Sequence, residues 1–133
     1  IGRALKKQFG PITQEERGTL FEGWIAGLLR SYQDARGLFD RWYYWSPAAA
    51  QKTEVDFLLE SGGRYLALEV KSGSRVHGDD LKGLKAIQEF KKGIKRWFIY
   101  TGSEKMKTEE GIEILPVMEF VKRLENKTLW ASP

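Results

Sequence analysis

The 133-residue sequence predicts one α/β domain, a three-layer sandwich in which helices cover a mixed sheet of four or five strands. Helical and strand patterns follow one another in the order α-β-β-β-α-β-β-α. The central pair of strands surrounds a glycine turn and alternates between apolar and charged residues. The chain is 41% hydrophobic and 13% aromatic, which is enough for a substantial core.

A long amphipathic helix opens the predicted domain, which spans residues 13–133. Thr13 and Glu16 form a capping-box pattern at the start of this helix, and Gly37 ends it. Residues 1–12 are expected to connect it to an upstream module, since the chain begins with Ile rather than Met. The apolar residues of the helix recur at helical spacing and are expected to form its buried stripe: Leu20, Phe21, Trp24, Ile25, Leu28, Leu29 and Tyr32.

The next elements are a strand, a hairpin and a second helix. The aromatic content of residues 38–46 favours a strand, and residues 47–50 form a connection to the hairpin. After the hairpin, Asp79 or Asp80 can cap a helix that runs to Phe90.

The remaining part of the chain predicts two strands and a terminal helix. Residues 95–101 read as a strand, and residues 102–111 as a polar loop. Residues 112–117 read as a short edge strand, because proline cannot donate a hydrogen bond to a neighbouring strand. Residues 118–126 read as the last helix.

The hairpin brings its charged residues into opposition. A loop at residues 62–63 requires the numbers of facing residues to sum to a constant, so Asp56 faces Glu69 and Glu54 faces Lys71. A slip of one residue would destroy this pairing. The same register gives the hairpin one entirely apolar face: Val55, Phe57, Leu59, Leu66, Leu68 and Val70.

The opposed carboxylates Asp56 and Glu69 suit metal chemistry. Directly opposed side chains have Cβ atoms about 5 Å apart. Two carboxylates this close repel each other unless one is protonated or a cation lies between them. A hard ion such as Mg²⁺ favours such ligands, and Lys71 can offset charge that develops on phosphate oxygens. The alternative is an idle surface ion pair between Glu54 and Lys71, but Asp56 is a poor strand former in an otherwise apolar strand.

Composition narrows the function classes. The net charge of +4 and the pI near 9.3 lean mildly towards polyanionic partners. The absence of cysteine excludes disulfides, thiol catalysis and cysteine-held metal centres. No apolar run approaches the roughly 20 residues that span a membrane, and no signal peptide is visible. A cytoplasmic location without a membrane partner is therefore expected.

Three motifs together resemble a known nuclease-like module. Residues 18–24 (GTLFEGW), 54–58 (EVDFL) and 68–72 (LEVKS) follow the order of the PD-(D/E)xK nuclease superfamily, which has the restriction-endonuclease-like fold. More closely, they resemble the C-terminal domain of unknown function of many bacterial and archaeal AAA+-type ATPases. The resemblance covers roughly residues 3–102. It departs from the superfamily name at Val55, which stands in place of proline.

The resemblance implies a role for each matching residue. Asp56 and Glu69 would bind Mg²⁺ or Mn²⁺ through their carboxylates, and Val70 through its carbonyl oxygen. Lys71 would be the catalytic lysine, and Glu22 would be the helix-borne acid that assists the metal or its water. The implied partners are a nucleic acid, expected to be DNA, and an ATPase module in the same chain, with a homo-oligomer left open.

Two other groups of residues, and one histidine, have both a structural and a functional interpretation. Six basic residues between Lys82 and Arg96 stand against one acid, so they can hold phosphates or form a solvated helix face. The aromatic run at residues 42–45 is expected to pack in the core rather than stack on bases. His77, the only histidine, is expected to be a solvated loop residue.

The sequence therefore predicts a Mg²⁺-dependent nuclease that hydrolyses nucleic-acid phosphodiesters. Two alternatives remain at this level. The first is a catalytically inactive nuclease-like module that binds nucleic acid or protein for an attached ATPase, and the second is a pure protein-interaction domain.

Overall fold

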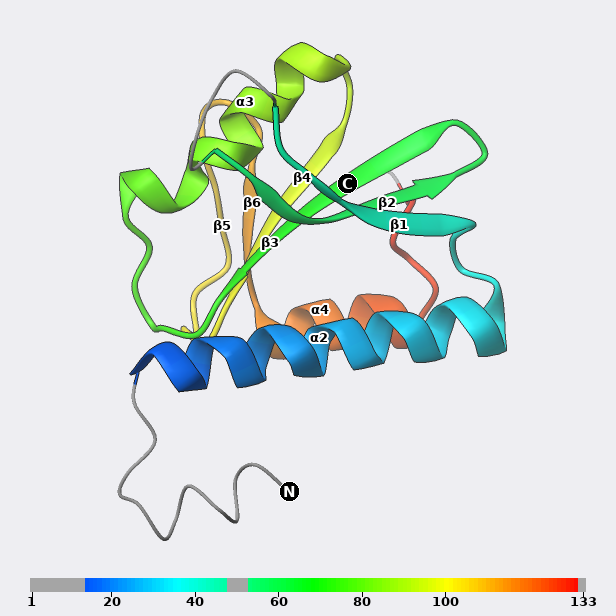
Figure 1. The fold of residues 1–133 in the computed structure, drawn as a ribbon, viewed down its shortest axis with the longest axis horizontal. Coiled ribbons are helices and arrows are strands. Elements are labelled where there is room, and N and C mark those ends of the chain that lie inside the picture. Colours follow the sequence, from blue (N-terminus) through cyan, green and yellow to red (C-terminus); the bar gives the residue numbers. More distant parts are fainter. Residues whose placement is uncertain (1–13, 48–52, 132–133) are drawn as a thin grey trace, which may run out of the picture.

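The computed structural model describes residues 14–47 and 53–131, which form a six-stranded sheet and three α-helices (Figure 1). The predicted connection at residues 1–12, the Thr13 cap and most of the connection at 47–50 lie outside the described residues. The helices are α2 (Gln14–Arg36), α3 (Lys82–Phe90) and α4 (Val117–Glu125), with a short 3₁₀ turn, η1 (Gly78–Leu81). The strands are β1 (Arg41–Trp45), β2 (Val55–Ser61), β3 (Arg64–Lys71), β4 (Lys95–Tyr100), β5 (Met106–Lys107) and β6 (Glu113–Pro116).

The sheet is mixed, as expected, with the strand order β1-β2-β3-β4-β6-β5. Strands β3, β4 and β6 run parallel, while the β1–β2, β2–β3 and β5–β6 pairs are antiparallel. The prediction of four or five strands is wrong, because the sheet has a sixth. The additional strand is the two-residue β5, which lies in the expected polar loop. The prediction that β6 is an edge strand is also wrong, because β5 covers it. Pro116 is tolerated because it is the last residue of β6.

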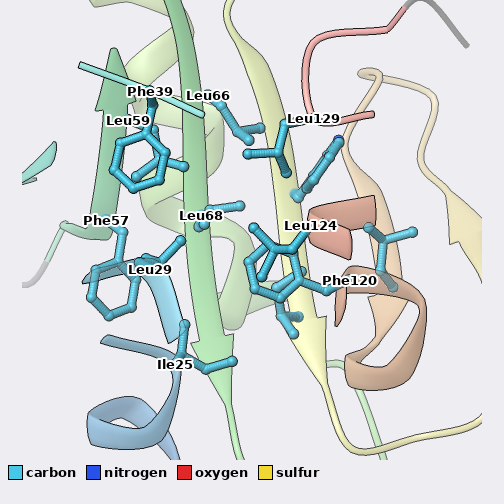
Figure 2. Close-up of a cluster of buried hydrophobic side chains, with 13 residues drawn as sticks. Ile25, Leu29, Phe39, Phe57, Leu59, Leu66, Leu68, Phe120, Leu124 and Leu129 are labelled. Atoms are coloured by element: carbon cyan, nitrogen blue, oxygen red, sulfur yellow. The ribbon is translucent and has the colours of Figure 1, made fainter. Parts of the chain in front are cut away.

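Helices cover both faces of the sheet (Figure 1). Helices α2 and α4 pack on one face, where their side chains meet those of β2, β3 and β4 around Leu29, Leu68 and Phe120 (Figure 2). Helix α3 packs on the other face, against a second cluster that includes Leu58 and Phe98. The sheet is therefore buried on both sides, and the polar residues of a functional site are confined to its edges and strand ends.

The β2–β3 hairpin has the expected register. Phe57 pairs with Leu68, and the ladder continues to the pair formed by Ser61 and Arg64. The two-residue turn has positive φ at Gly62 (56°) and at Gly63 (81°), a conformation that glycine adopts without strain. The turn thus fixes which residues of the two strands face each other.

The expected apolar face of the hairpin is interrupted at Val55. The β1–β2 register shifts between Tyr43, which pairs with Leu58, and Trp45, which pairs with Val55. Strand β2 therefore has one extra residue here, a β-bulge next to Asp56. As a result Val55 is buried with Leu58 on the α3 face, so its predicted side was wrong.

Helix α2 has a narrower buried stripe than its sequence suggests. Ile25 and Leu29 are fully buried, but Leu20 and Trp24 are 47% and 49% exposed. The second helix also differs in detail, because residues 78–81 form the 3₁₀ turn and α3 begins only at Lys82. None of the described helices is long and apolar enough to cross a membrane.

Candidate functional site

The end of the hairpin farthest from its turn holds two interlocked carboxylates. The backbone hydrogen bonds between β2 and β3 end at the pair of Phe57 and Leu68. At the next position, carboxylate side chains accept the backbone N–H groups instead. The Asp56 N–H donates to Glu69 Oε1 at 3.0 Å, and the Val70 N–H donates to Asp56 Oδ2 at 3.0 Å. Each carboxylate is therefore held by the backbone of the opposite strand, and the two side chains are also hydrogen-bonded to each other.

Burial and crowding make negative charge unfavourable at this position. Burial raises the pKa of Glu69, and its hydrogen bond with Asp56 and the charges of Asp56 and Glu54 raise it further, to about 10. Burial is also the main cause that raises the pKa of Asp56, although hydrogen bonds from Glu69 and from the Val70 N–H oppose it. The pair is thus prepared to share a proton or to bind a cation.

Glu22 adds a third acid from helix α2. Burial raises the pKa of Glu22, and the negative charges of Asp56 and Glu54 raise it further, so these side chains lie within electrostatic range. Glu22 lines an open groove of about 460 Å³ between the first half of α2 and the end of β3. Val70 and Lys71 line the opposite side of this groove.

Lys71 lies at the site, but its amine is directed to a different acid. Its Nζ donates to Asp80 Oδ1 at 2.7 Å, and Asp80 Oδ2 accepts the His77 N–H at 2.8 Å. Burial alone would raise the pKa of Asp80, but the bonds from Lys71 and His77 outweigh it and lower that pKa. Asp80 therefore acts as the anchor of Lys71 rather than as the cap of α3.

The surface ion pair between Glu54 and Lys71 is not formed. Glu54 accepts a hydrogen bond from the Tyr44 hydroxyl, and Lys71 is paired with Asp80. Tyr44 and Asp80 are the residues of this site that the sequence did not indicate. Of the aromatic run at residues 42–45, which was expected to pack in the core, Trp42 and Trp45 are partly buried against the two core clusters, whereas Tyr43 and Tyr44 are exposed.

The site offers two carboxylates to a divalent ion, but no third acidic or histidine ligand among the described residues. Within residues 14–47 and 53–131, no three His, Cys, Asp or Glu side chains converge closely enough to hold a metal ion. Mg²⁺, however, is usually bound through one or two carboxylates and retains several waters. Asp56 and Glu69, fixed to each other and crowded, meet that requirement, with the Val70 carbonyl as a third candidate ligand.

Comparison with known proteins identifies a family for most of the chain. A family model described as "Domain of unknown function (DUF4143)" matches residues 17–120. This range contains Glu22, Asp56, Glu69 and Lys71. A search of curated proteins finds no match to the chain.

Proposed function

The chain belongs to DUF4143, a family of domains of unknown function, and we propose that it is a metal-dependent nuclease domain that hydrolyses DNA phosphodiesters. On this proposal its fold is the restriction-endonuclease-like variant of the αβα sandwich, and its site is the PD-(D/E)xK type. The proposal includes a larger parent protein in which the domain follows an ATPase module.

The interlocked pair of Asp56 and Glu69 is the observation that carries the proposal. Two carboxylates from neighbouring strands are held against each other by 3.0 Å hydrogen bonds to the backbone, at a position where burial opposes their charge. Stability alone gives no reason for this arrangement, because crowded buried acids destabilise a fold. Bound there, Mg²⁺ or Mn²⁺ supplies Lewis acidity towards a phosphate oxygen and lowers the pKa of a coordinated water.

The other residues of the site position the substrate and the water. Glu22, on the α2 side of the groove, can orient a water that approaches the phosphorus and accept its proton, since its pKa is raised. Lys71, on the β3 side, can offset the charge that develops on the phosphate oxygens. Its partly exposed ion pair with Asp80 contributes only about 0–1 kcal/mol, so a bound phosphate can draw the amine away at small cost.

Incubation with DNA tests this function directly. Single-stranded, duplex and branched DNA are incubated with the domain and Mg²⁺ or Mn²⁺, and the products are separated by electrophoresis. We expect cleavage that requires the ion and that falls by at least about 100-fold in Asp56→Asn and in Lys71→Met. Glu60→Gln, a change on the same strand at an acid paired with Arg41, is the matched control and should cleave normally. Cleavage that survives Asp56→Asn contradicts the proposal.

A second candidate function is a nuclease-like module that binds nucleic acid or protein without cutting. The observation that favours it is the direction of the Lys71 amine, which is paired with Asp80 at 2.7 Å instead of facing the carboxylate pair. This candidate predicts that the domain takes up no divalent ion in calorimetry. It also predicts that Asp56→Asn leaves every binding activity intact.

A further inference from the structure

A basic pocket lies at the opposite end of the sheet from the carboxylate pair. Its volume is about 220 Å³, and it is formed by the hairpin turn, the connection from α3 to β4 and the segment that follows α4. Its lining includes four cationic side chains, two aromatic rings and no acid: Arg64, Lys91, Lys92, Lys95, Tyr65 and Trp130. Three of the six basic residues that the sequence groups between positions 82 and 96 are thus brought together with an arginine from the hairpin.

Three of the four cations of this pocket have no carboxylate partner among the described residues. Within the described part of the chain, Arg64, Lys91 and Lys92 form no ion pair. Glu60, which accepts a hydrogen bond from Tyr65, is paired with Arg41. Glu113, whose charge acts on Lys95, is paired with Arg123. Like charges gathered without counter-charges are unfavourable unless an anion is bound.

The aromatic rings hold the cations in place. The Arg64 guanidinium lies 4.9 Å from the centre of the Trp130 ring, and the Lys91 amine lies 4.9 Å from the centre of the Tyr65 ring. The Trp130 indole N–H donates to the Leu38 carbonyl at 3.0 Å, which fixes the ring. Because a cation lies over each ring, the pocket is built to present positive charge rather than to stack on a base.

Lys95 holds one side of the pocket in position through hydrogen bonds to the backbone. Its amine donates to the carbonyl of Leu129 at 3.0 Å and to that of Ala131. These bonds hold the segment that carries Trp130 against the start of β4. The pocket is therefore formed before any ligand arrives, which lowers the entropic cost of binding.

We propose that this pocket binds a backbone phosphate of the nucleic acid whose cleavage is proposed above. This second proposal rests on the first for the identity of the anion. The guanidinium fork of Arg64 suits phosphate oxygens, and the two lysines add point charges. Arg64 and Lys71 are the first and last residues of β3, so the pocket and the catalytic end of the hairpin are about 23 Å apart. That distance corresponds to about seven base pairs of duplex DNA. The contact reads the backbone, so it is independent of base sequence.

Salt-dependent binding tests the pocket. The variant Arg64→Gln/Lys91→Gln/Lys92→Gln removes three exposed charges, and Lys82→Gln/Lys107→Gln/Lys122→Gln removes three exposed charges elsewhere as the control. Affinity for a fluorescein-labelled 20-base-pair duplex is measured by anisotropy in EDTA over a series of salt concentrations. We expect the pocket variant to bind at least about tenfold more weakly at 0.1 M salt, with a salt slope reduced by about 2. The control should lose less than about threefold.

Three outcomes overturn the proposal. In the first, the wild-type domain binds no duplex at low salt. In the second, the two triple variants lose DNA affinity equally. In the third, polyglutamate displaces the duplex as readily as unlabelled DNA does. Failure of the nuclease proposal is seen separately. In that case no cleavage depends on Asp56, while the pocket variant still differs from its control in DNA affinity.

Discussion

At the level of single residues, the central feature is the exchange of hydrogen bonds between Asp56 and Glu69. The β2–β3 ladder ends at Phe57 and Leu68, next to the β-bulge of β2, and beyond it the two side chains accept backbone N–H groups at 3.0 Å. The sequence predicted that these residues face each other, because the glycine turn fixes the register. It did not predict the bulge, because a bulge depends on the pairing of β2 with β1, a distant segment.

The raised pKa of Glu69 predicts how one substitution changes stability with pH. The pKa of Glu69 is about 10 in the folded protein and 4.5 in the unfolded chain. The contribution of Glu69 to the free energy of unfolding is therefore fully present below pH 4.5 and is lost as the pH rises towards 10. Glutamine keeps the acceptor oxygen and carries no charge. In EDTA, Glu69→Gln should therefore raise Tm at pH 8 by about 5 °C and change it little at pH 4.5.

Thermal unfolding followed by circular dichroism measures both values. Glu109→Gln, a substitution at an exposed acid, is the control and should leave Tm unchanged at both pH values. A gain in Glu69→Gln that is the same at both pH values, or a loss at pH 8, contradicts the assignment of Glu69 as the crowded acid.

The partners of Lys71 and Glu54 could not be predicted from the sequence. Lys71 reaches Asp80 because the loop after β3 turns back and places η1 beside the strand end. Glu54 reaches Tyr44 across the β1–β2 pair, at the point where its register shifts. Both contacts depend on the path of a loop or a bulge, for which a single sequence contains no periodic pattern.

At the level of elements, the close contact of α3 with β2 supports the site from behind. Gly83 lies in the first turn of α3, and a Cβ atom added to it would lie 1.8 Å from the Glu54 carbonyl oxygen. Only glycine allows this approach, so α3 fixes the backbone at Glu54, two residues before Asp56.

Gly83→Ala should therefore destabilise the domain although alanine favours helices. We expect a loss of about 2 kcal/mol, seen as a Tm about 8 °C lower, together with weaker cleavage, because the backbone of Glu54 must shift. Gly78→Ala, with no neighbouring atom within 4 Å of the added Cβ, is the control and should be tolerated. A Gly83→Ala variant as stable as the wild type would show that α3 does not hold this segment.

The long elements were predictable, and the short ones were not. The amphipathic pattern of α2 and the apolar strand β4 agree closely with their expected ranges, since long periodic segments carry the strongest signal. The two-residue strand β5 is too short to show a pattern. The exposure of Leu20 and Trp24 was also unpredictable, because it depends on which side of α2 faces the sheet, and their neighbours Phe21 and Ile25 occupy that side.

At the level of the whole molecule, charge is separated along the strands of the sheet. Acids gather where β3 ends, and cations gather where β3 begins. The net charge of +4 gave only a mild indication of a polyanionic partner, because it sums over this separation. On the two proposals made above, an elongated polyanion contacts both ends, with one phosphate in the basic pocket and another at a cation held by the carboxylate pair.

The titration of the domain with Mn²⁺ tests the central claim, that Asp56 and Glu69 form a divalent-cation site, without knowledge of the substrate. Isothermal titration calorimetry at neutral pH should show one saturable site in the wild type and in Glu60→Gln. In Asp56→Asn the affinity should fall by at least about tenfold. No saturable binding by the wild type, or equal affinity in Asp56→Asn, would contradict the claim.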